Sequence, residues 1–167
     1  MDVLNYLLIV VTSFLGLFIG IFVSNSAVEE IKNASKYLKY LNIAIVPLII
    51  LIATFEINKL YSLIFTGIVL IALIVARNKY NDAWTYAGMG ALLYVSTISQ
   101  QTLNVAVLIF IYGFSIATIN ASMHFKKQIN GQIKFSENIS LVKKILIKYP
   151  YYLIVATVFF VIFTYVL

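Results

Sequence analysis

Long apolar runs separated by short polar stretches fill the chain from one end to the other. A helix needs about 20 mostly apolar residues to cross the hydrocarbon of a bilayer, with a range of about 17 to 25. Six runs come close to this length, so the sequence predicts an all-α integral membrane protein with a bundle of six transmembrane helices in one domain. The predicted helices cover residues 4–23, 41–57, 60–76, 83–98, 103–123 and 151–167.

Two further segments alternate apolar and charged positions with the spacing of a helix. In residues 26–40, Ile31 and Leu38 fall on one side while the charged residues lie off it, and residues 136–148 carry a similar apolar stripe beside lysines. This pattern predicts two amphipathic helices that lie in the membrane interface. Lysines in and before them are candidate contacts for anionic lipid or for a partner: Lys32, Lys36, Lys39, Lys126, Lys127, Lys134, Lys143, Lys144 and Lys148.

The distribution of charge predicts an orientation. The segments 24–40, 77–82 and 124–149 lie on one side of a six-helix topology and carry three, two and six of the 12 basic residues, which leaves only Lys59 for the other side. By the positive-inside rule these segments face the cytoplasm, so both termini are expected outside the cell membrane. Trp84 and Tyr86 are both expected in an aromatic belt. An inverted repeat of two three-helix halves stays open.

Polar residues concentrate in the predicted hairpin of residues 83–122, around the turn at 99–104. Polar groups in hydrocarbon cost free energy unless they are paired or line a cavity, so this hairpin is the predicted site. Either the hydroxyls bond to carbonyls of their own helix, or they line a path for a solute. Residues 99–104 form either a tight turn or a re-entrant break. The candidate path residues are Ser96, Thr97, Gln100, Gln101, Asn104, Tyr112, Ser115, Thr118 and Asn120.

Small residues recur every four positions in the first and fifth predicted helices, a spacing that lets helices approach closely. The predicted packing seam comprises Thr12, Gly16 and Gly20 in the first helix and Gly113, Ala117 and Ala121 in the fifth. This seam faces either another helix of the same chain or a second subunit.

Composition narrows the classes of function. The chain is 62% hydrophobic and 11% charged and has no cysteine, which excludes disulfides and thiolate chemistry. With one histidine and no paired carboxylates inside a predicted span, the sequence indicates no enzyme, metal site or cofactor and no nucleic-acid partner. The expected function is a non-catalytic subunit, scaffold or assembly factor of a membrane complex, with a membrane protein or a second copy as partner. The alternative is a small uncoupled channel or transporter that uses the polar hairpin.

Overall fold

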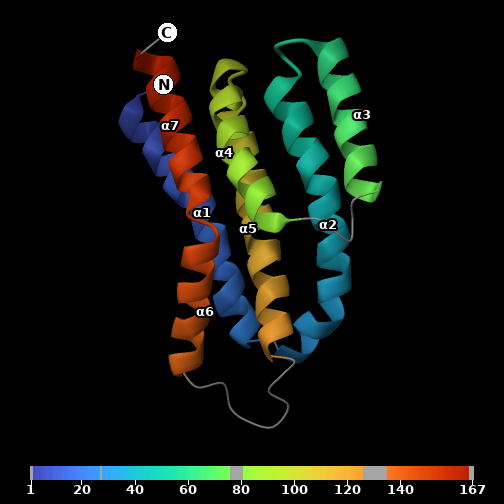
Figure 1. Cartoon of the computed structure of the whole chain (residues 1–167), viewed down its shortest axis with the longest axis vertical. Coiled ribbons are helices and arrows are strands. Elements are labelled where there is room, and N and C mark those ends of the chain that lie inside the picture. Colours follow the sequence, from blue (N-terminus) through green and yellow to red (C-terminus); the bar gives the residue numbers. More distant parts are fainter. Residues whose placement is uncertain (1, 27, 76–80, 126–134, 166–167) are drawn as a thin grey trace.

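The computed structural model describes residues 2–26, 28–75, 81–125 and 135–165, and these residues form an all-helical bundle (Figure 1). The predicted helix ends at residues 76 and 167 lie outside the described residues. The helices are α1 (Val3–Ser26), α2 (Val28–Thr54), α3 (Lys59–Val75), α4 (Asp82–Ile98), α5 (Thr102–Phe125), α6 (Phe135–Lys148) and α7 (Tyr151–Tyr165).

Four helical stretches in the described part of the chain are long and apolar enough to cross a membrane. They are Val3–Ser24, Asn33–Thr54, Thr102–Met123 and Val142–Ile162, and the last begins in α6 and ends in α7. Helix α3 is apolar but shorter, at 17 residues. The chain is therefore a helical membrane protein.

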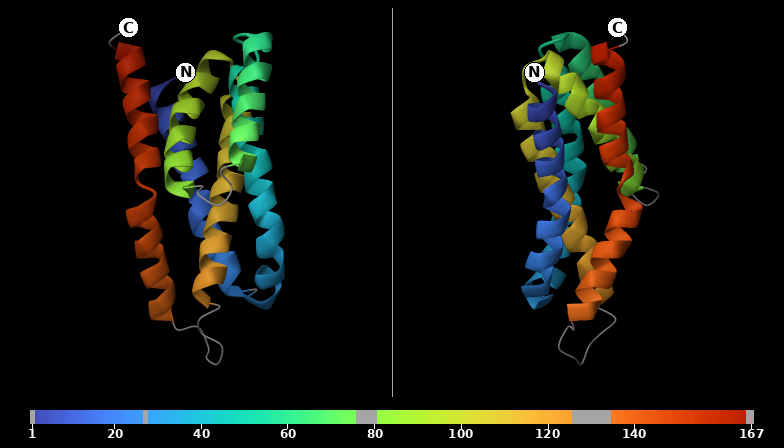
Figure 2. Two further views of the ribbon diagram at one scale, coloured as in Figure 1. Left: turned by 45° about the vertical axis from the view of Figure 1, so that its right-hand side comes forward. Right: turned by 90° about the vertical axis from the view of Figure 1, so that its left-hand side faces the viewer.

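The helices differ in how much of the bundle's length they cover. Helices α1, α2 and α5 run the length of the bundle, whereas α3 and α4 occupy only the half that holds the start of α1 and the end of α7 (Figures 1 and 2). Helix α5 is central and packs against α1, α2 and α4, while α4 also packs against α7. Helix α3 lies at the edge against α2. The end of α3 and the start of α4 therefore lie partway along the bundle.

Helix α2 differs from the predicted division into an interfacial helix and a span that meet at residues 40–41. It continues unbroken from Val28 to Thr54, with Pro47 inside it. The apolar stripe that begins at Ile31 continues through Ile45 to Ile49, all of them buried. Because one stripe packs against the bundle on both sides of the predicted boundary, nothing favours a bend there.

Helix α6 also differs from the expected interfacial placement. An interfacial helix lies across the axes of the spanning helices, but α6 runs along the bundle axis and continues the line of α7 (Figure 2). It packs against α1, and its Ile145 is buried. Pro150 separates the two helices, and α7 begins at the next residue, as proline in a first turn permits.

Tyrosine side chains fill much of the core. The Tyr86 ring lies 4.7 Å from that of Tyr152 and 5.8 Å from that of Tyr149, measured between centroids, and all three side chains are fully buried. The placement of Tyr86 in an aromatic belt is therefore wrong, because α4 turns this side chain toward α7. Trp84 is exposed and stacks on Tyr151 at 6.1 Å.

Candidate functional site

The predicted polar turn is a tight helix–helix connection. Helix α4 ends at Ile98 and α5 begins at Thr102, and between them Gln100 adopts a left-handed φ of 57°. The Ser96 carbonyl accepts the Gln101 N–H at 2.9 Å and the Thr102 hydroxyl at 3.3 Å. A left-handed residue followed by such a bond back to the last turn is a common way to cap a helix C-terminus. No re-entrant segment forms here.

The hydroxyl and amide groups next to this turn bond locally. The Ser96 hydroxyl donates to the Leu93 carbonyl at 2.6 Å, and the Thr97 hydroxyl donates to a carbonyl of its own helix at 2.7 Å. Asn104 Nδ2 lies 2.6 Å from Gln101 Oε1 on the exposed side of the turn. These groups therefore have partners without a solute.

Further along α5, the candidate path residues connect helices. The Ser115 hydroxyl donates to a backbone carbonyl of α2 at 3.2 Å, and the Thr118 hydroxyl donates to one of α1 at 3.4 Å. Asn120 Nδ2 donates to the Tyr149 hydroxyl at 3.1 Å. The buried Tyr112 ring packs against Tyr86. Such bonds are the kind that hold membrane helices together.

The small-residue seam is used within the chain. Gly16 and Gly20 of α1 lie directly against the backbone of α5 at Phe110 and Phe114. Ala117 and Ala121 are buried, and Gly113 lies close to Leu17 and to the Tyr86 hydroxyl. Thr12 is exposed and its hydroxyl bonds to the Leu8 carbonyl, so this end of the predicted seam lies off the contact.

The candidate lysines fall into two groups. Lys36 and Lys39 are exposed on α2, and Lys143, Lys144 and Lys148 are exposed on α6. Lys126, Lys127 and Lys134 lie outside the described residues, as does the side chain of Lys32.

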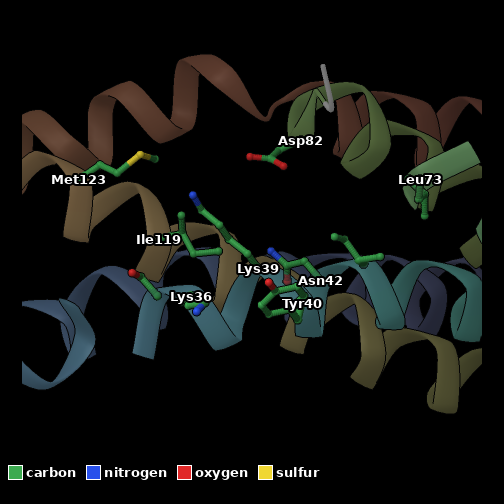
Figure 3. Close-up of a pocket in the computed structure, with 10 residues that line it drawn as sticks. Lys36, Lys39, Tyr40, Asn42, Leu73, Asp82, Ile119 and Met123 are labelled. Carbon is green, nitrogen blue, oxygen red and sulfur yellow. The ribbon is translucent and has the colours of Figure 1, made fainter. Parts of the chain in front are cut away.

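A cavity of about 480 Å³ opens beside the lysines of α2 (Figure 3). It lies where α3 ends and α4 begins, between these helix ends, α2 and α5. In Figure 3, Lys39 extends from α2 toward the carboxylate of Asp82. The volume is in the range of about 300 to 1,000 Å³ that small-molecule sites occupy. The lining residues are Ser35, Lys36, Lys39, Tyr40, Asn42, Ile43, Leu73, Asp82, Ile119 and Met123.

The electrostatics of this cavity centre on Asp82, in the first turn of α4. Partial burial raises the pKa of the Asp82 carboxyl, while the positive charges of Lys148 and Lys39 lower it and so offset part of that effect. Lysines from α2 and α6 thus act on one carboxylate that α4 supplies. Lys39 and Asp82 line the cavity, whereas Lys148 acts on Asp82 from outside the lining.

Asn42 supplies an unpaired polar group in the same wall. Its side chain is only 5% exposed, and Oδ1 has no hydrogen-bond partner. A buried acceptor without a donor costs about 1–3 kcal/mol, so such a group is worth explaining. Neither Asn42 nor Asp82 is among the site residues that the sequence predicts. An amide inside an apolar run was the available signal for Asn42.

A second cavity, of about 430 Å³, lies between the end of α2 and the outward face of α3. Its wall includes Thr54 and Ser62, whose hydroxyls lie 2.8 Å apart, and is otherwise mostly apolar, with Ile64, Phe65 and neighbouring residues. It offers room for hydrocarbon but no charged group.

No protein-family model, no curated protein and no solved structure matches this chain.

Proposed function

We propose that the protein is a non-catalytic, six-span bundle of the cell membrane that acts as a subunit, scaffold or assembly factor of a membrane complex. Helices α3 and α4 have 17 residues each and are therefore about 25 Å long at 1.5 Å per residue. That length is close to the hydrocarbon thickness of about 30 Å. This length supports the proposal that α3 and α4 cross the same slab of hydrocarbon as the four longer apolar stretches.

The observation that carries the proposal is the part of the bundle that extends beyond this slab. Helices α1, α2 and α5 have 24, 27 and 24 residues, so they are longer than α3 by roughly 10–15 Å. Their projecting ends, together with α6, form what we call the basal end. It exposes the large side chains of Phe22, Val23, Tyr37 and Met123. These side chains lie at the basal ends of the stretches Val3–Ser24, Asn33–Thr54 and Thr102–Met123, so the basal end stays apolar up to the inner edge of the slab. An exposed apolar surface at the edge of a bundle is typical of protein–protein contact sites.

The lysines support a cytoplasmic position for the basal end. Lys36 and Lys39 of α2 and Lys143 and Lys144 of α6 are exposed there or at its border with the slab. Helix segments rich in lysine stay on the cytoplasmic side. With the basal end inside, the start of α1 and the end of α7 face outward, because both lie at the opposite end of the bundle (Figure 1).

The polar hairpin supports a structural role more than a solute path. Its buried hydroxyls at Ser96, Ser115 and Thr118 already donate to backbone carbonyls, two of them on other helices. A hydroxyl that holds two helices together is not available to replace the hydration of a passing solute. The channel or transporter alternative therefore has no specific observation in its favour.

The proposal is tested by photo-crosslinking in the native membrane. A photoreactive residue at Phe22, which is 61% exposed at the basal end, is expected to capture one defined polypeptide. The matched control at Ile64, 52% exposed on the outward face of α3, is expected to capture lipid only. Native mass spectrometry of the complex in mild detergent should show the same polypeptide in a fixed ratio. A monomer without crosslinks, or equal capture from both positions, would refute the proposal.

A further inference from the structure

The cavity beside α2 lies at the depth of lipid headgroups. Helix α3 crosses about one hydrocarbon thickness, and the cavity touches Leu73 near its inner end and Asp82 at the start of α4. On the α2 side the cavity runs from Ser35 to Ile43, where lysines give way to apolar residues. Lipid phosphates occupy this level of a bilayer.

The charge of the cavity matches a single negative charge. Lys36 and Lys39 contribute two positive charges to the lining and Asp82 one negative charge, which leaves a net charge of +1. A phosphodiester carries one negative charge, whereas a phosphate monoester carries up to two. Lysine binds phosphate as a point charge with three rotatable donors. The lining is therefore complementary to a phosphodiester.

Asn42 lines the same wall but does not define the ligand. Its unpaired Oδ1 is shielded from the cavity, so a headgroup that enters the cavity does not reach this atom. The charge of the lining therefore determines which ligand fits.

The apolar part of the lining favours an amphiphile over a free solute. It consists of Ile43, Leu73, Ile119 and Met123, while Ser35 and Tyr40 are the remaining polar lining residues. Next to Leu73, the side chains of Ile71 and Ile74 are exposed on the outward face of α3, where acyl chains would lie.

We propose that this cavity binds the headgroup of an anionic phospholipid with one negative charge on its phosphodiester, for which phosphatidylglycerol is the probe. Lys36 and Lys39 hold the phosphate. The acyl chains leave past Leu73 along α3. This site does not depend on the proposed role in a complex, and its test uses the protein alone.

Native mass spectrometry of the full chain in detergent, titrated with dioleoyl phosphatidylglycerol, measures binding at the cavity. We expect this lipid to bind at least tenfold more tightly than dioleoyl phosphatidylcholine, and the deacylated headgroup, glycerophosphoglycerol, to bind far more weakly than either. Equal binding of the two lipids would overturn the proposal. Equally tight binding of the deacylated headgroup would make the ligand a soluble phosphodiester and overturn the assignment to lipid.

Two double variants distinguish lipid binding in the cavity from non-specific electrostatic attraction to the lysines. Lys36→Gln/Lys39→Gln removes two charges from the cavity, and Lys143→Gln/Lys144→Gln removes two from α6, away from the lining. We expect the first pair to weaken phosphatidylglycerol binding roughly 30-fold, from about fivefold per lysine, and the control pair to change it less than about threefold. Equal losses in the two pairs would overturn the proposal.

Discussion

The close approach of α1 to α5 at Gly16 and Gly20 allows a quantitative prediction. A Cβ atom on Gly16 would overlap the carbonyl oxygen of Phe110 and lie 2.9 Å from its carbonyl carbon. At Gly20 it would overlap the Phe114 carbonyl oxygen and lie 2.8 Å from the Cβ atom of Ala117. The obstacles at Gly16 are backbone atoms, which no change of rotamer can move.

The size of the effect follows from the distance that the helices must yield. Carbon atoms in contact lie about 3.5–4.0 Å apart, so a methyl group on Gly16 must push α1 from α5 by roughly 1 Å. Overpacking of this kind costs about 1–3 kcal/mol, while alanine recovers at most about 1 kcal/mol of helix propensity over glycine. We expect Gly16→Ala to lower the free energy of unfolding by about 1–2 kcal/mol.

Two glycines with open space beside them supply the control. A Cβ atom on Gly67 or Gly88 would meet nothing within 4 Å, so alanine there should leave stability unchanged or raise it by up to about 1 kcal/mol. The measurement is equilibrium unfolding of the full chain in mixed micelles of dodecyl maltoside and dodecyl sulfate, followed by far-UV circular dichroism. If Gly16→Ala is as stable as Gly67→Ala, the α1–α5 contact is not the one described.

Three further predictions concern other parts of the bundle. In the same unfolding assay, Tyr6→Phe should cost about 1 kcal/mol because its hydroxyl donates to a carbonyl of α7 at 3.1 Å, whereas Tyr86→Phe should cost nothing because that hydroxyl has no partner; equal losses would contradict this pairing. Because the chain has no cysteine, single cysteines at the exposed positions Gln100 and Lys143 can report topology. An impermeant thiol reagent should label the cysteine at position 100 in intact cells and the one at position 143 only after permeabilisation. The reverse result would contradict the proposed orientation. Asp82→Asn raises the charge of the cavity to +2, so it should shift binding from phosphatidylglycerol toward phosphatidic acid, as native mass spectrometry would show, and an unchanged preference would remove Asp82 from the site.

The apolar periodicity of the chain was sufficient to locate most helices. The predicted ends of α4 and α5 lie within two residues of the observed ones, because the turn at residues 99–101 and the polar residues before α4 interrupt the apolar runs. Pro150 likewise marked the start of α7. These are local signals, and local signals determine where a helix starts and stops.

The same local signals were misleading where packing continues across a change in composition. The lysine-rich part of α2 has the pattern of an interfacial helix, yet Ile31 and Ile45 lie on one buried stripe, and the helix continues unbroken to Thr54. The composition of a segment indicates whether it is stable in contact with water. It does not by itself bend a helix, because a bend forms only where packing or a backbone breaker favours it.

The candidate cavity depended on contacts between distant parts of the chain. Asn42 and Asp82 come from α2 and α4, and their neighbourhood is closed by Ile119 of α5. No spacing in the sequence connects these positions, because each is isolated among residues of a different helix. Which side chains meet is decided by how helices rotate and cross when they pack.

By itself the sequence indicated that this chain is a membrane protein, which runs are helical, and that most basic residues fall in the segments 24–40, 77–82 and 124–149, because these follow from hydrophobicity, local breakers and the positions of the charges. Only the tertiary structure decided that the glycine seam joins α1 to α5, that the polar hairpin is bonded to its own bundle, and that lysines, an aspartate and an unpaired amide line one cavity. The physical reason is that hydrophobicity acts on each segment separately, whereas close packing and hydrogen bonding act between segments that the sequence separates.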